Sequence, residues 1–192
     1  LTEFTVFTDI NSYYYYYKDI DGVLFDKSGE NLIAYPGGNT RSSYIIHSSV
    51  MSIPLYAFQS ATYLTNFAVD DNNYYYKDID GVLFNRHNAL IAYPGGNTRS
   101  SYTIPETVTV IKSLAFYGAI NLTKFMITSR NDYYSNDTDG ILFDKTKETL
   151  IAYPQANTIS SYTIPTTVKS IGQWAFVSTG LEIVYVSQTI VD

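Results

Sequence analysis

The fold of this protein is decided by the stretch LIAYPGGNTRSSY, which runs from Leu32 to Tyr44 and occurs again, letter for letter, from Leu90 to Tyr102. A third copy, LIAYPQANTISSY, runs from Leu150 to Tyr162 with three changes. A second motif precedes each copy: YYYYYKDIDGVLF from Tyr13, YYYKDIDGVLF from Tyr74 and YYSNDTDGILF from Tyr133. Long motifs that recur in register are the signature of repeat proteins.

Two apolar motifs complete each repeat. The first places valine, isoleucine, alanine and phenylalanine at spacings of three, four and one, and it spans 50–58, 108–116 and 168–176. The second is a leucine with apolar residues three and five positions later, starting at Leu1, Leu64, Leu122 and Leu181. Counted from that leucine, residues 1–192 form a single repeat domain with units 1–63, 64–121 and 122–180 and a partial unit 181–192. Because the chain starts within the pattern, we expect a fragment of a longer protein.

The turn residues of each unit predict short strands. Asp-Gly between apolar or aromatic runs is a strong hairpin signal, so we expect structural turns at Asp21-Gly22, Asp80-Gly81 and Asp139-Gly140. Further strands are predicted at Leu-Ile-Ala-Tyr and at Ser-Ser-Tyr-Thr-Ile, separated by the Pro-Gly-Gly-Asn loop. The Val-x-x-Ile-x-x-x-Ala-Phe motif has spacings that suit a short helical turn.

One such unit buries too little apolar surface to offset its ordering entropy, whereas stacked units share a continuous core. The sequence therefore predicts a repeat solenoid that is mainly β with short helical turns. The small residues Ala57, Ala115 and Ala175 beside phenylalanines predict a tightly packed column in that core.

These motifs resemble the BspA-like, or Treponema-type, leucine-rich repeats, and the resemblance covers nearly the whole chain. It implies a leucine-rich-repeat right-handed superhelix with a ladder of strands on one face. It also implies an extracellular or cell-surface location and adhesion to a host or microbial surface protein or glycan. The resemblance implies no catalytic residue and no cofactor.

Composition excludes several classes of function. The net charge is −6 and the 12 lysines and arginines are scattered, which argues against a nucleic-acid partner. No apolar run approaches the roughly 18 residues of a membrane span, so we expect no membrane insertion within this chain. The absence of cysteine excludes disulfides, thiolate metal sites and a cysteine nucleophile.

Sites for metal binding or catalysis are not predicted. The Asp-x-Asp-Gly motifs hint at calcium, but the EF-hand pattern fails, since its last ligand position would be Ser28, His87 or Thr146. The two histidines, His47 and His87, occupy unrelated repeat positions and have no convergent partners. The carboxylates lie mostly in repeated turns, so a unique glycosidase pair is not expected. We therefore predict no enzyme activity.

The 20 tyrosines are the candidate recognition residues. We interpret the tyrosines of Leu-Ile-Ala-Tyr and Ser-Ser-Tyr as structural ladders, because aromatic side chains pack well across neighbouring strands. The tract before the Asp-Gly turn must expose some of its tyrosines, because alternate residues of a strand face opposite ways. Residues at the same distance before the turn aspartate are taken as equivalent across the units. This gives two sets of candidate partner-binding residues: Tyr15, Tyr74 and Tyr133, and Tyr16, Tyr75 and Tyr134. For this tract, packing and recognition are equally weighted alternatives.

Two functions remain open. The first is a secreted or surface domain that binds a protein or glycan through its extended surface, where repeated weak contacts add up to avidity. The second is an architectural stalk without its own ligand.

Overall fold

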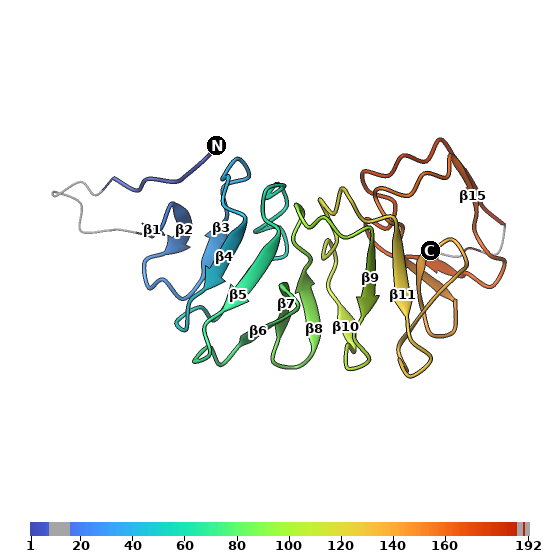
Figure 1. The fold of residues 1–192 in the computed structure, drawn as a ribbon, viewed down its shortest axis with the longest axis horizontal. Helices are drawn as coiled ribbons and strands as arrows, with labels where there is room; N and C mark the ends of the chain where they lie inside the picture. The colour runs from blue at the N-terminus through green and yellow to red at the C-terminus, as the bar shows by residue number, and fades with distance from the viewer. Residues whose placement is uncertain (8–15, 188–189, 191–192) are drawn as a thin grey trace.

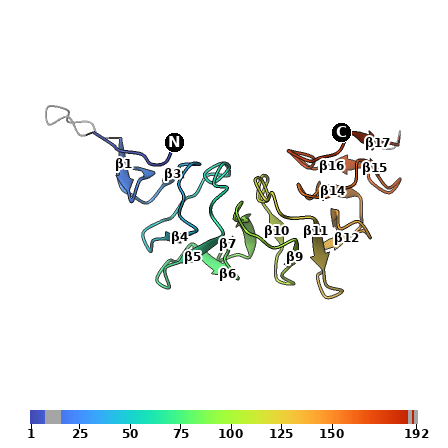
Figure 2. The same cartoon turned by 45° about the horizontal axis from the view of Figure 1, so that its top comes forward.

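The structure is a computed structural model, and it describes residues 1–7, 16–187 and 190. The chain forms a solenoid that advances from the N-terminal to the C-terminal end along the long axis of the molecule, as Figure 1 shows, and the row of coils is bent (Figure 2). The predicted repeat solenoid is thus confirmed.

Three separate two-stranded sheets are formed by motifs that lie about one coil apart in the sequence, and the strands of each pair run parallel. Within each pair, a strand of the Ser-Ser-Tyr motif lies beside a strand of the leucine motif, and Ser43 is the register partner of Asn66. The pairs are β4 (Ser43–Ile46) with β5 (Asn66–Val69), β9 (Ser101–Ile104) with β11 (Lys124–Ile127) and β15 (Ser161–Thr163) with β17 (Ile183–Tyr185). Each sequence unit therefore builds two coils, a short one between paired strands and a long one that holds the hairpin.

The hairpin motifs form three small antiparallel sheets along the solenoid. Their strands are β1 (Tyr17–Ile20), β2 (Val23–Asp26) and β3 (Leu32–Ala34), then β6 (Tyr76–Ile79), β7 (Val82–Asn85) and β8 (Ala89–Ala92), then β12 (Tyr134–Asn136), β13 (Leu142–Asp144) and β14 (Thr149–Ala152). The short strands β10 (Val110–Ile111) and β16 (Ser170–Ile171) extend the second and third sheets by pairing in parallel with β8 and β14.

The Asp-Gly pairs of the first two units are two-residue hairpin loops. Asp80 and Gly81 join β6 to β7 with φ angles of 51° and 78°, and Asp21 and Gly22 join β1 to β2 in the same way. Positive φ at both residues matches the twist of a hairpin. A Cβ on Gly81 would also lie 2.7 Å from the Cβ of Asn66, so this loop sits directly against β5.

The third hairpin differs from the other two. Five residues, 137–141, separate Asn136 from its register partner Leu142. Gly140 has a φ of 80°, and the carboxylate of Asp137 accepts the N–H groups of Asp139 and Ile141. Asp139 and Gly140 therefore lie inside a longer loop and do not form a two-residue turn.

The predicted helical turns are wrong, because the described residues contain no α-helix. The isoleucines Ile111 and Ile171 belong to strands β10 and β16. The following segments 55–60, 113–118 and 173–178 are turns in which a residue bonds to the carbonyl three positions earlier, as from the N–H of Ala115 to Lys112. Leu114 and Trp174 have φ near 65°, and this left-handed conformation stops a right-handed helix from continuing.

The core consists of three apolar clusters that follow one another along the solenoid, and each of the first two includes residues of the next unit. Its fully buried side chains include phenylalanines and leucines that recur at equivalent positions, among them Phe25, Phe84, Phe143, Leu32, Leu90 and Leu150. Ala57, Ala115 and Ala175 are buried as predicted. The structural interpretation of the two tyrosine ladders is confirmed, since Tyr93 and Tyr102 are buried with ring centroids 5.0 Å apart and each flanking unit holds the same pair.

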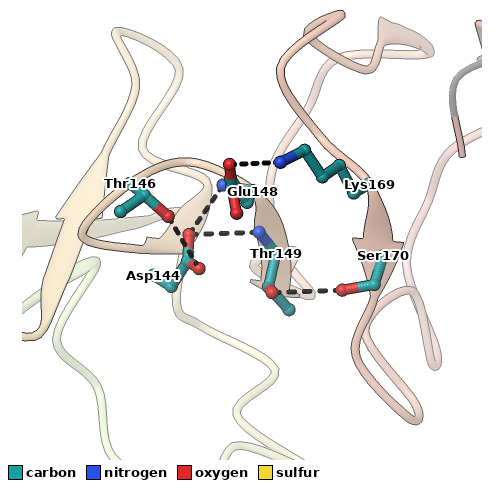
Figure 3. Close-up of polar contacts among 6 residues, drawn as sticks. All are labelled: Asp144, Thr146, Glu148, Thr149, Lys169 and Ser170. Atoms are coloured by element: carbon teal, nitrogen blue, oxygen red, sulfur yellow. Dashed lines mark hydrogen bonds and ion pairs between the residues drawn. The ribbon is translucent and has the colours of Figure 1, made fainter.

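An acidic or amide side chain closes the turn after the second hairpin strand. In the third unit the carboxylate of Asp144 accepts the N–H groups of Glu148 and Thr149 at 2.8 and 3.0 Å (Figure 3). Glu148 pairs with Lys169 at 2.5 Å, and the hydroxyls of Thr149 and Ser170 lie 3.1 Å apart. These contacts attach the hairpin to the start of β16.

Candidate functional site

A buried asparagine decides which tyrosines of the tract face outward. The Oδ1 atom of Asn73 accepts the N–H groups of Tyr75 and Tyr76 at 2.8 and 2.7 Å. Its Nδ2 atom donates to the carbonyls of His47 and Val50 at 2.7 and 3.0 Å. This Asx-turn fixes the start of β6 against the preceding coil. Tyr76 then points inward, whereas Tyr74 and Tyr75 are 86% and 45% exposed.

The inward tyrosine is part of the core. Tyr76 is only 7% exposed. Burial raises the pKa of its hydroxyl, although a hydrogen bond to the backbone of Ile53 acts in the opposite direction. Tyr134 is equally buried in the third unit, where its hydroxyl donates to the carbonyl of Thr109 at 3.2 Å. Tyr134 therefore presents no surface to a partner.

The structure corrects the repeat register that the turn aspartate predicted. The carbonyls of Tyr16, Tyr75 and Tyr133 each accept an N–H from the basic residue after the second hairpin strand. Tyr76 and Tyr134 likewise occupy equivalent strand positions, opposite Asn85 and Asp144. The predicted grouping is off by one residue because the third hairpin has a longer loop.

The remaining candidates lie at the surface or outside the described part of the chain. Tyr16 and Tyr133 are 68% and 49% exposed. Tyr15 lies outside the described residues. Among these candidates, the structure brings Tyr74 and Tyr75 together on one concave surface.

That surface, which we name the tyrosine groove, has a volume of about 420 Å³. It lies between the segment after Val50 in the first unit and the hairpin of the second. Its lining comprises Met51, Ile53, Leu55, Tyr74, Tyr75, Tyr76, Asn85, Arg86, His87, Ile91 and Lys112. It combines exposed aromatic rings, apolar side chains and basic groups, a mixture that is typical of recognition surfaces.

One basic group of the groove, the guanidinium of Arg86, is held by the backbone carbonyl of the same asparagine. Arg86 donates from Nε and Nη2 to the carbonyl of Asn73 at 3.2 and 2.7 Å. In the third unit, Lys145 donates from Nζ to the carbonyl of Asn131. A cation thus closes the Asx-turn in both units, and in the second unit it also lines the groove.

The equivalent positions of the third unit have a different chemistry. By strand register, Asp132, Tyr133 and Thr146 take the places of Tyr74, Tyr75 and His87. Thr109 and Ser113 take the places of Met51 and Leu55. Because the backbone repeats while these side chains change, the aromatic and apolar character belongs to the groove of the second unit in particular.

The two histidines lie in different surroundings. Nε2 of His47 lies 3.9 Å from the carboxylate of Asp21, and both side chains are exposed. His87 is exposed at the rim of the tyrosine groove. The described residues contain no group of three or more histidines and carboxylates placed to hold a metal ion.

Sequence reasoning missed the asparagines and cations that build this site. A signal was present, because Asn73 and Asn131 both stand three residues before the buried tyrosine of the strand. Likewise, a basic residue follows the second hairpin strand in every unit, as Lys27, Arg86 and Lys145. The apolar contribution of Met51 and Leu55 comes from the preceding unit, and no local motif marks it.

A second, smaller groove of about 160 Å³ lies between the turns 113–118 and 173–178. Its lining is mainly apolar and includes the exposed Trp174. This groove lacks the clustered cations of the tyrosine groove, with Lys112 as its one basic lining residue.

The folded chain is a leucine-rich-repeat solenoid. The family model for the BspA-type leucine-rich repeat region, which comprises six copies, matches residues 92–139 and 141–192. Together these residues exceed half of the chain. The chain therefore belongs to the BspA-type leucine-rich repeat family. The resemblance inferred from the motifs is confirmed.

Two solved structures share the fold. A leucine-rich repeat protein from Eubacterium ventriosum is 22% identical over 87% of this chain and 55% of its own, with a TM-score of 0.51. The pneumococcal vaccine antigen PcpA is 21% identical over 78% of this chain and 40% of its own, with a TM-score of 0.53. This chain thus spans about half the length of those proteins or less.

No curated protein is a significant match. No helix among the described residues has the length and apolarity needed to cross a membrane.

Proposed function

We propose that this chain is a cell-surface or secreted binding domain without catalytic activity, and that it recognises a host or microbial surface protein or glycan through the tyrosine groove. The observation that supports the proposal is the exposure of Tyr74 and Tyr75 beside Met51 and Arg86 in one groove. Tyrosine, methionine and arginine are enriched where protein partners bind. The likeness in fold to a vaccine antigen supports a location outside the cell.

Repeat architecture suits this role, because a solenoid presents a long, rigid surface whose side chains vary over a constant backbone. The tyrosine groove follows this pattern, since its backbone recurs in the third unit while its side chains differ.

The experiment is a binding screen of the wild-type chain against arrays of extracellular proteins and glycans. The double variant Tyr74→Ser/Tyr75→Ser removes the exposed rings and leaves Tyr76 and Asn73 in place. We expect at least a tenfold loss of affinity, which corresponds to about 1.4 kcal/mol. Tyr133→Ser is the matched control, because Tyr133 has nearly the same exposure and the same backbone contact as Tyr75.

The alternative function is an architectural stalk. A stalk would retain nothing from either array. If the double variant and the Tyr133→Ser control both still bind the array partner, recognition takes place elsewhere on the solenoid.

A further inference from the structure

We propose that the tyrosine groove recognises an acidic peptide segment of a partner protein, with an apolar side chain as its anchor. This inference rests on the proposed function and specifies the chemistry of its ligand. It follows from three properties of the lining: its apolar floor, its charge and the kind of polar groups that it offers.

The floor of the groove is apolar. Ile91 and Tyr76 are buried, Ile53 is partly buried, and Met51 and Leu55 expose large apolar surfaces at the rim. An aliphatic or aromatic side chain that enters here removes apolar surface from water on both partners, which favours binding. The unbranched Met51 side chain adapts to the shape of such an anchor.

The charge of the groove opposes that of the whole chain. Arg86, His87 and Lys112 line it, and no carboxylate does, although the net charge of the protein is −6. Asp71 lines an adjoining hollow together with Tyr74 and Arg86. Lys112 lines the groove but not that hollow, so charge complementarity favours a carboxylate beside Lys112.

The free polar groups of the groove suit a peptide better than a sugar. The hydroxyls of a sugar lose water on binding and each needs a donor or an acceptor in return. The amide in the lining, Asn85, already accepts the N–H groups of His87 and Ala89 at 3.0 and 2.8 Å. The remaining lining offers cations, tyrosine hydroxyls and apolar groups, which match carboxylates and an apolar anchor.

The test uses three fluorescent peptides and the full 192-residue chain. The first peptide has one leucine flanked by glutamates, and the other two have glutamines or lysines in place of the glutamates. A sialylated oligosaccharide is the glycan probe. Fluorescence anisotropy is measured for the wild type and for Lys112→Glu, Tyr75→Ser, Lys124→Glu and Tyr133→Ser. Lys124 is exposed on β11 and provides the same change of charge away from the groove.

We expect the glutamate peptide to bind at least tenfold more tightly than the lysine peptide, and its affinity to fall with rising salt. Lys112→Glu and Tyr75→Ser should each weaken it at least tenfold, whereas the two control variants should change it less than twofold.

Equal affinity for all three peptides, or a preference for the lysine peptide, would overturn the inference. Tyr75-dependent binding of the glycan without binding of the glutamate peptide would also overturn it, yet would leave the proposed function standing. If neither class of probe binds and the array screen retains nothing, both proposals fail.

Discussion

The Oδ1 atom of Asn73 lies 2.7 Å from the backbone nitrogen of Tyr76, and this contact separates the inner tyrosine of the tract from the outer ones. The same amide donates to two carbonyls of the preceding coil. One side chain therefore links the hairpin to its neighbour and turns Tyr74 and Tyr75 toward the groove. Asn131 holds Tyr133 and Tyr134 in the same way in the third unit.

Replacing Asn73 by alanine should destabilise the protein strongly. The substitution leaves two N–H groups and two carbonyls without their partner in a buried place, at a cost of about 2–4 kcal/mol in total. Urea unfolding followed by circular dichroism measures the change. Asn72→Ala is the control, because Asn72 is exposed and bonds locally to Asp70. Equal stability of the two variants would contradict the assigned role.

Replacing Ala115 by leucine should overpack the shared core. Ala115 is buried, and its carbonyl accepts the N–H of Tyr93 at 2.7 Å. A leucine forces neighbouring side chains or the backbone to move, which costs about 1–3 kcal/mol. Differential scanning calorimetry should show a lower melting temperature, and an unchanged one would refute the packed column.

The hydroxyls of two equivalent tyrosines should differ in their effect on stability. Tyr162 donates to the carboxylate of Asp137 at 2.6 Å, whereas the buried hydroxyl of Tyr102 has no hydrogen-bond partner among the described residues. Tyr162→Phe should cost about 1.5–3 kcal/mol, the usual range for a bond to a charged group. Tyr102→Phe should be nearly neutral. The two unfolding free energies are compared in urea, and a larger loss for Tyr102→Phe would reverse the assignment.

Acid should weaken the first hairpin through Asp26. Burial acts to raise the pKa of this carboxyl, but hydrogen bonds from the side chain and N–H of Asn31, from Ser28 and from Gly29 together lower the pKa from 3.8 to about 2. Because the folded pKa lies below the unfolded value, the stabilisation is complete above about pH 4 and is lost as the pH falls toward 2.

The variant Asp26→Asn isolates that contribution. Asn85 occupies the equivalent position in the second unit and accepts two N–H groups as an amide, so the variant should fold. Its unfolding free energy should change less between pH 4 and pH 2 than that of the wild type. Parallel curves for the two proteins would show that Asp26 does not contribute.

The tyrosine site illustrates the limit of the sequence. The sequence predicts that the tract is partly exposed, but counting back from Asp139 aligns Tyr134 with Tyr75, whereas the backbone contacts align Tyr133 with Tyr75. The loop of residues 137–141 shifts that register by one residue, because a longer hairpin loop moves the turn and leaves the strand contacts unchanged. The helical turns were mispredicted for a related reason. Spacings of three and four suit a helix locally, yet Leu114 and Trp174 adopt left-handed backbone conformations between strands that are already paired.

The sequence by itself determined the repeat, its family, most of the strands and most residues of the core, because those features depend on local periodicity and turn chemistry that recur in every unit. Only the tertiary structure decided which tyrosines face outward and which residues join them. Asn73 selects the outer face through bonds to a coil more than twenty residues away. Met51 reaches the groove from the preceding unit, and Lys112 from a later coil of the same unit. Such a surface forms where coils stack. Because the residues that line it lie far apart in the sequence, no local motif predicts it.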